Sequence, residues 1–132
     1  NPSIDVVIDL HRDGVAETTR LVTNIDGKQM AKVMLFNGLS YSVRNGDIGY
    51  LYNPYRDDNL AMSLQMYLLG QAYYPDYFRR IYVNAYRYCL HERGKSMLIE
   101  AGAQTNTFEE VKNAMEPLAD LLDKLLKGEK AY

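Results

Sequence analysis

The amino-acid sequence predicts an α/β layered domain, in which a mostly parallel or mixed central sheet is flanked by helices. Two short apolar runs are typical of buried strands: the β-branched run Ile4–Leu10, which indicates a strand covered on both faces, and Met97–Ile99. An amphipathic pattern that begins at Thr107 predicts a long helix after the second run. Strands that alternate with helices favour layered packing, and 132 residues correspond to one domain.

The first half of the chain predicts two more strands and a long loop. Arg20–Ile25 and Ala31–Phe36 have strand-like composition, and the Asp26-Gly27 pair between them is a strong hairpin signal. The distance between the two runs implies a connection longer than two residues. Residues 37–58 are rich in Gly, Asn, Asp and Tyr, so we expect a long irregular surface segment there.

Two consecutive helices are predicted between this loop and the Met97–Ile99 strand. The first begins at Asp57 or Asp58, because acidic residues suit a helix N-terminus, and it ends before Pro75. The apolar stripe expected on its inner side comprises Leu60, Leu64, Tyr67, Leu68 and Gln71. The second helix is expected over Asp76–His91, where apolar residues recur at helical spacing.

The last helix has the clearest boundaries in the sequence. Thr107 and Glu110 form a capping box, in which each side chain accepts a hydrogen bond from a free backbone N–H of the first turn. Gly128 ends the pattern. The apolar stripe between these limits comprises Val111, Ala114, Met115, Leu118, Leu121, Leu122, Leu125 and Leu126.

Composition excludes several classes of function. The net charge of −2 and a pI near 5.7 do not predict a nucleic-acid-binding surface, and no apolar run is long enough to cross a bilayer. The single cysteine, Cys89, excludes an internal disulfide and a cysteine-rich zinc site. Twelve tyrosines without a tryptophan predict either a core and rim of packed rings or a surface for a sugar polymer or a protein partner.

Two strand ends carry the candidate chemistry. Glu100 follows the Met97–Ile99 run directly, and the first strand runs out into His11, with Asp9 on the same side two residues earlier. Open α/β sheets hold reactive groups at the carboxyl ends of their strands. If the two strands are neighbouring and parallel, His11 and Glu100 lie at one end of the sheet. The alternatives are a structural histidine and a glutamate paired with an arginine.

Three groups of residues resemble a known family. Asp-Leu-His-Arg-Asp-Gly at 9–14, Asn-Leu-Ala at 59–61 and Leu-Ile-Glu-Ala-Gly-Ala-Gln-Thr-Asn-Thr at 98–107, with the glutamates at 109–110, occur in the order found in stage II sporulation protein P. This family of spore-forming bacteria is related to the zinc-dependent N-acetylmuramoyl-L-alanine amidases of cell-wall turnover. The resemblance extends from about Asp5 to Leu122, and the segment at 98–107 is its most specific part.

The resemblance implies a peptidoglycan hydrolase of sporulation and engulfment, with zinc as its cofactor. The expected reaction is cleavage of the amide between muramic acid and the L-alanine of the stem peptide, and the same domain is also expected to cut peptide cross-links. His11 matches a zinc ligand, and Glu100 matches the catalytic glutamate. From their positions next to His11, either Asp9 or Asp13 is expected to hold the other ring nitrogen of that histidine. Further candidates for substrate or structural hydrogen bonding are Arg12, Asn59, Arg80 and Asn106. For Asn106 the alternative is a role in the turn before Thr107.

The chain departs from the family pattern in two respects. The family has an earlier strand with a His-x-His run followed by a glutamate, which this chain lacks, and it reads Tyr-Asn-Gln where this chain has Tyr88-Cys89-Leu90. We therefore expect residues 1–132 to be the carboxyl-terminal portion of a peptidoglycan amidase catalytic domain. One metal ligand and the base are expected to be present, so that the chain binds zinc weakly or not at all.

The resemblance also implies partners and a location. The expected partners are peptidoglycan and a transglycosylase like stage II sporulation protein D, without nucleic acid. The expected location is extracytoplasmic, at the septal or engulfing membrane of a sporulating cell, through an anchor outside this chain. The alternative function is a non-catalytic interaction module that binds a sporulation partner protein or glycan strands through the tyrosine-rich segments and the 37–58 loop.

Overall fold

A four-stranded mixed sheet forms the centre of the molecule in the computed structural model, which describes residues 1–131. The strand order is β1–β8–β4–β7, with bounds Val7–Asp13, Ser96–Ala103, Val33–Gly38 and Tyr82–Asn84. Strand β1 runs parallel to β8, β4 runs antiparallel to β8, and β7 runs parallel to β4. The predicted α/β class with a mixed central sheet is therefore confirmed.

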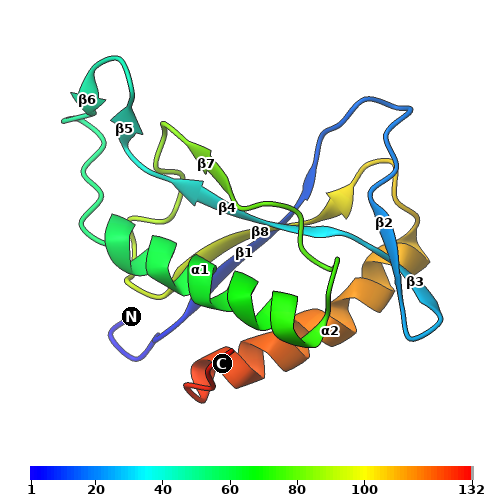
Figure 1. Cartoon of the computed structure of the whole chain (residues 1–132). Helices are drawn as coiled ribbons and strands as arrows, with labels where there is room; N and C mark the ends of the chain where they lie inside the picture. Colours follow the sequence, from blue (N-terminus) through cyan, green and yellow to red (C-terminus); the bar gives the residue numbers. More distant parts are fainter. Residues whose placement is uncertain (132) are drawn as a thin grey trace.

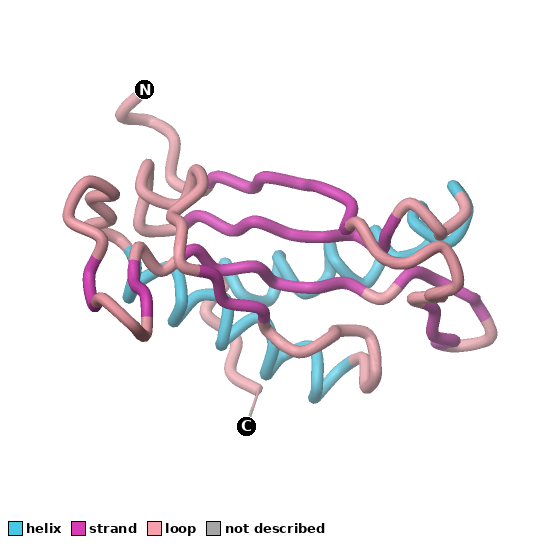
Figure 2. Tube along the Cα trace, turned by 90° about the horizontal axis from the view of Figure 1, so that it is seen from above, coloured by secondary structure: helices cyan, strands magenta, loops and turns pink. Residues whose placement is uncertain are grey.

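Both long helices lie on the same side of this sheet (Figure 1). Helix α1 spans Arg56–Tyr73 and helix α2 spans Phe108–Leu126. Figure 2 shows the strands side by side with the helices behind them. The main core fills the space between the two layers, and its buried side chains include Val33, Leu35, Met97 and Ile99 from the sheet and Met66, Leu69, Leu118 and Leu121 from the helices.

The predicted hairpin is present, but its turn is shorter than expected. Strands β2 (Val22–Ile25) and β3 (Lys28–Ala31) are joined by only Asp26 and Gly27, whose φ angles of 51° and 80° suit a type I′ turn. The single strand predicted over Ala31–Phe36 is divided, because Lys32 separates β3 from β4. The hairpin packs beside α2, while β4 continues into the central sheet (Figure 1).

Strand β1 is not covered on both faces, so that part of the prediction is wrong. It is an edge strand of the central sheet, and Ile8 and Leu10 are 40% and 53% exposed. These two residues pair with Met97 and Ile99, and they point to the helix side of the sheet. The β-branched run therefore predicted a strand correctly. Whether that strand is central or at the edge depends on its pairing with other strands, which the run itself does not determine.

The helix predicted over Asp76–His91 is also wrong. This segment contains β7 and a series of turns, with positive φ angles of 70° at Asp76 and 54° at Tyr88 that no α-helix can accommodate. Its apolar residues are used for tertiary contacts instead. Tyr77 and Phe78 are buried in the core, and β7 hydrogen-bonds to β4, so pairing between strands outweighs the local helical spacing.

Helix α1 was predicted at the right place but with the wrong inner side. Its buried residues are Asn59, Met62, Ser63, Met66, Leu69 and Gly70, whereas Leu64 is half exposed. The inner side of α1 was not recognised in the sequence because it includes polar residues. The Ser63 hydroxyl, for example, donates to Asn37 Oδ1 at 3.0 Å. The irregular segment before α1 holds one short hairpin, formed by β5 (Tyr41–Ser42) and β6 (Gly46–Asp47) (Figure 1).

The structure of α2 confirms the predicted capping box and apolar stripe. The Thr107 hydroxyl accepts from the Glu110 backbone N–H, and the Glu110 carboxylate accepts from the Thr107 backbone N–H, which completes the capping box. Ala114, Leu118 and Leu121 of the predicted stripe are buried. Neither α2 nor any other helix within residues 1–131 combines the length and apolarity needed to span a membrane.

Candidate functional site

His11 and Glu100 are direct neighbours across the β1–β8 pair. The register of the two parallel strands places His11 opposite Glu100. Side chains alternate between the faces of a sheet, and Ile99, next to Glu100, points into the core beneath the helices. His11 and Glu100 therefore share the opposite face, on which no helix packs. The structure thus brings together the two residues that the sequence singled out, while their proposed roles stay predictions.

The registers of all four strands arrange this helix-free face into two rows. One row runs across the sheet through His11, Glu100 and Met34. The adjacent row, two residues earlier on β1 and β8, consists of Asp9, Leu98, Phe36 and Tyr82. Two residues along a strand correspond to about 6.6 Å, so the apolar and aromatic row lies directly beside the candidate site.

Glu100 is the least satisfied carboxylate of this face. Its Oε2 atom is buried and has no hydrogen-bond partner in the described part of the chain. Burial is the main cause that raises the pKa of Glu100 above its usual value, and the negative charge of Asp13 adds to it, while His11 and Arg79 partly offset the rise. A carboxylate with an unpaired oxygen and a raised pKa is suited to accept a proton.

Asp9 holds the imidazole of His11. Its Oδ1 lies 2.6 Å from His11 Nε2, and its Oδ2 accepts a hydrogen bond from the Cys89 thiol at 2.8 Å. The bond from Cys89 is the main cause that lowers the pKa of Asp9; burial opposes it, and His11 lowers the pKa further. The predicted choice between Asp9 and Asp13 is thereby resolved in favour of Asp9. The contribution of Cys89 was not predicted, since nothing in the sequence placed residue 89 near residue 9.

Asp13 pairs with Arg79, which was not among the predicted site residues. Its Oδ2 accepts from Arg79 Nη1 at 2.6 Å, and its Oδ1 accepts from the Gly14 backbone N–H at 2.8 Å. Arg80, the arginine predicted for the site, is exposed, and the prediction of Arg80 is therefore not supported by a contact at this face. Phe78 is buried in the core, so the next residue, Arg79, is the one directed across the helix-free face. Only the knowledge that Phe78 points inward would have distinguished the two arginines.

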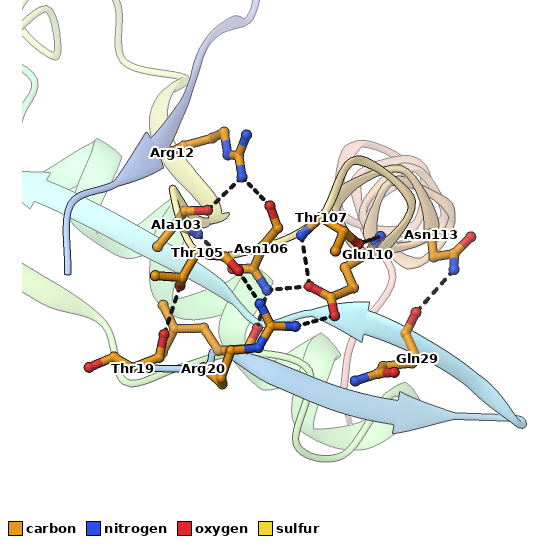
Figure 3. Close-up of polar contacts among 11 residues, drawn as sticks. Arg12, Thr19, Arg20, Gln29, Ala103, Thr105, Asn106, Thr107, Glu110 and Asn113 are labelled. Carbon is orange, nitrogen blue, oxygen red and sulfur yellow. Dashed lines mark hydrogen bonds and ion pairs between the residues drawn. The ribbon is translucent and has the colours of Figure 1, made fainter. Parts of the chain in front are cut away.

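Arg12 and Asn106 support the loop after β8 (Figure 3). Arg12 Nη2 donates to the carbonyl oxygens of Ala103 and Asn106, each at 2.6 Å. The Asn106 side chain uses both of its polar atoms: Oδ1 accepts from the Ala103 N–H at 2.8 Å, and Nδ2 donates to Leu21 O and Glu110 Oε2, each at 3.0 Å. The structural role is therefore the one observed for both residues.

Glu110 completes this junction between the loop and α2. Its carboxylate accepts from Asn106, from the Thr107 backbone and from the Arg20 guanidinium (Figure 3). Burial by itself would raise the pKa of Glu110, but the hydrogen bonds from Thr107 and Asn106, together with the charge of Arg20, hold the pKa below its usual value. The carboxylate of Glu110 thus stays ionised and fixes the loop that follows Glu100.

Asn59 is likewise a structural residue. It is 1% exposed, and its Nδ2 donates to the carbonyl oxygens of Leu90 at 2.6 Å and Arg93 at 3.0 Å. Its Oδ1 accepts from the Ser96 backbone N–H at 2.9 Å. The first turn of α1 is thereby tied to the segment that precedes β8, and no polar atom of Asn59 is left for a substrate.

The described residues do not by themselves fit a complete zinc site. Zinc in a catalytic site takes three protein ligands, whereas no group of three or more His, Cys, Asp or Glu side chains within residues 1–131 is placed to hold a metal ion. A pocket of about 630 Å³ lies at the other end of β8, beside Gly94 and Lys95, and it does not include His11 or Glu100.

Comparison with known proteins gives one family. A family model described as stage II sporulation protein P (SpoIIP) matches residues 1–123, which include every strand of the central sheet and most of α2. Neither the curated proteins nor the solved structures gave a match.

Replacement of Glu100 by glutamine should stabilise the fold at neutral pH. An acid with a raised pKa in the folded state costs stability when it is ionised, and this cost disappears when the pH falls below its ordinary pKa near 4.5. We expect E100Q to raise the free energy of unfolding at pH 7 by roughly 0.5–2 kcal/mol, the range common for single stabilising substitutions. Urea unfolding at pH 7 and at about pH 4 measures the difference, which should shrink at the lower pH; a less stable E100Q at pH 7 would contradict this account.

Proposed function

Because the chain belongs to the stage II sporulation protein P family and therefore has a role in sporulation, we propose that it acts on the cell wall as an N-acetylmuramoyl-L-alanine amidase. The proposed substrate is peptidoglycan, and the proposed bond is the amide between muramic acid and the first residue of the stem peptide. Cleavage of peptide cross-links by the same site is part of the proposal.

The single observation that carries this proposal is the position of Glu100. Its unpaired Oε2 lies on the same face as His11, on the neighbouring strand and in register with it. Amide hydrolysis needs a group that removes a proton from water and returns it to the leaving nitrogen, and a carboxylate with a raised pKa suits both steps. We assign this acid–base role to Glu100.

Zinc is proposed as the cofactor, with His11 as one ligand. When bound, such an ion lowers the pKa of water and polarises a carbonyl group. The remaining ligands would come from outside residues 1–131, since the described carboxylates and His11 do not form a three-ligand group. Asp9 already occupies Nε2 of His11 with a hydrogen bond, which is the usual arrangement for a histidine whose other nitrogen binds a metal.

The exposure of His11 fits a polymeric substrate. His11 and Glu100 lie on the sheet face that no helix covers within residues 1–131, and the side chain of His11 is 52% exposed. A glycan strand with its stem peptide could reach such a face without entering a pocket. We further propose an extracytoplasmic location, with a membrane anchor outside these residues, and cooperation with a transglycosylase like stage II sporulation protein D.

The direct test is the release of stem peptides from purified sacculi. The full-length protein with zinc should release them, and E100Q should lower the rate by roughly 10²–10⁴-fold, the usual contribution of a general acid–base group. Glu109→Gln is the matched control, because Glu109 is an exposed glutamate in the first turn of α2. Equal rates for E100Q and the wild type would exclude Glu100 as the base.

Zinc binding by the 132-residue chain should be weak. One histidine with carboxylates on a half-exposed face offers fewer ligands than the three that a catalytic zinc requires. Isothermal titration with zinc chloride should therefore give a dissociation constant weaker than micromolar. Micromolar or tighter binding, abolished by His11→Ala, would show that the chain carries more of the metal site than proposed.

A second function is favoured by the exposed tyrosines. Tyr41, Tyr50 and Tyr52 lie in and after the β5–β6 hairpin, while Tyr82, Tyr86 and Tyr88 lie in and after β7 (Figure 1). All six are more than 40% exposed. These rings could form a module that binds glycan strands or a sporulation partner without catalysis. Titration of the labelled chain with soluble glycan strands would shift their NMR signals in this case, whereas shifts confined to residues around His11 and Glu100 would favour the amidase.

A further inference from the structure

The segment Tyr86–Glu92 covers the aromatic row beside His11 and Glu100. Leu90 is buried against Met34, Phe36 and Leu98. The Tyr88 ring meets the Phe36 ring edge-on, with centroids 4.7 Å apart and an interplanar angle of 85°. This segment therefore forms a wall of the candidate site, although it is far from β1 and β8 in the sequence.

The backbone of this segment is held in an unusual conformation. Tyr88 has a φ angle of 54°, which is rare for a bulky residue and persists only where the surroundings enforce it. Asn59 supplies part of that enforcement, because its buried amide holds the carbonyl oxygens of Leu90 and Arg93. The residue between the strained Tyr88 and the anchored Leu90 is Cys89, and its thiol is directed to Asp9.

The Asp9 carboxylate is fixed at both oxygens. Cys89 Sγ donates to Oδ2 at 2.8 Å, and His11 Nε2 lies 2.6 Å from Oδ1. We infer that Cys89 is a positioning residue: its thiol fixes the rotation of the Asp9 carboxylate, which in turn holds His11 in the tautomer with a proton on Nε2 and a free lone pair on Nδ1. The importance of that lone pair for catalysis rests on the function proposed above for His11.

The chemistry of the thiol fits this role better than that of a nucleophile. Burial is the main cause that raises the pKa of Cys89 to about 11, and the adjacent Asp9 contributes to the rise. The thiol is therefore protonated at neutral pH and is able to donate, whereas reactive cysteines have lowered pKa values. Because an ionised carboxylate can only accept, it needs donors at both oxygens to hold one orientation, and Cys89 and His11 supply them.

Histidine NMR tests this inference without zinc or substrate. Long-range ¹H–¹⁵N spectra of the labelled 132-residue chain at about pH 8 distinguish the two imidazole tautomers. The wild type should show one tautomer for His11, with the lone pair on Nδ1. Cys89→Ser keeps a donor and should keep that tautomer, whereas Cys89→Ala, which is matched to serine in size, should give a mixture. A single unchanged tautomer in Cys89→Ala, or equal mixtures in both variants, would overturn the inference.

A second variant, Asp9→Asn, should reverse the tautomer of His11. In Asp9→Asn the thiol should donate to the amide oxygen, so that the amide NH₂ faces His11 and the proton moves to Nδ1. Adding Cys89→Ala should abolish this reversal, because the amide can then turn either way. The inference fails if the double variant keeps the reversed tautomer. His91, which contacts Tyr88 O and Glu92, serves as an internal check that the segment remains folded.

Activity separates this inference from the proposed function. In the full-length protein, Cys89→Ala should lower kcat on sacculi by roughly tenfold or more, as for other groups that orient a metal-binding histidine, and Cys89→Ser should restore it. An active wild type with an unaffected Cys89→Ala variant would contradict the positioning role. An inactive wild type would contradict the proposed amidase alone, and the tautomer spectra would still decide the role of Cys89.

Discussion

The parallel pairing of β1 with β8 is the constraint on which the candidate site depends. It places His11 opposite Glu100 and Asp9 opposite Leu98, on the face that no helix covers. Successive side chains of a strand point to opposite faces of the sheet. A shift of the register by one residue would therefore turn the His11 side chain toward the helices. The other strand of the site is well fixed, because β8 is buried between β1 and β4, with Met97, Ile99 and Ala101 almost inaccessible.

Polar junctions, rather than apolar packing, hold the loops around this pairing. Asn106 and Glu110 connect the loop after β8 to α2 (Figure 3). Asn59 connects α1 to the segment before β8. Each of these side chains is buried and has its hydrogen bonds to the protein made, as buried polar groups require. Glu100 differs from these three residues, since one of its oxygens is buried without a partner. Asn37, Ser40, Asn53 and Ser96 also have a buried polar atom without a partner in the described part of the chain, and Glu100 is the one carboxylate among these five residues.

The sequence predicted correctly those elements whose structure depends on a few adjacent residues. The capping box of α2, the Asp26-Gly27 turn and the apolar run of β8 each depend on a few adjacent residues, and each is present. A helix was predicted where β7 lies, because the pairing of β7 with β4 joins residues 46 positions apart in the sequence. The inner side of α1 was misjudged because Asn59 and Ser63 are buried by hydrogen bonds that join distant segments.

Part of the candidate site was also predictable from the sequence, and part of it was not. His11, Asp9 and Glu100 were accessible to sequence reasoning because strand ends and alternation are short-range properties. Arg79 and Cys89 were not, since both reach β1 from a segment whose course depends on the tertiary fold. The family match over residues 1–123 supports a role in sporulation, and the geometry of the face adds the residues through which such a role would act.

The register between β1 and β8 is the property to measure first. A solution NMR structure of the 132-residue chain would record nuclear Overhauser effects between β1 and β8. The account predicts cross-peaks between the side-chain protons of His11 and Glu100, whose strands should lie about 4.8 Å apart. Cross-peaks from Leu10 to Glu100, with His11 close to the core residues beneath the helices, would contradict it.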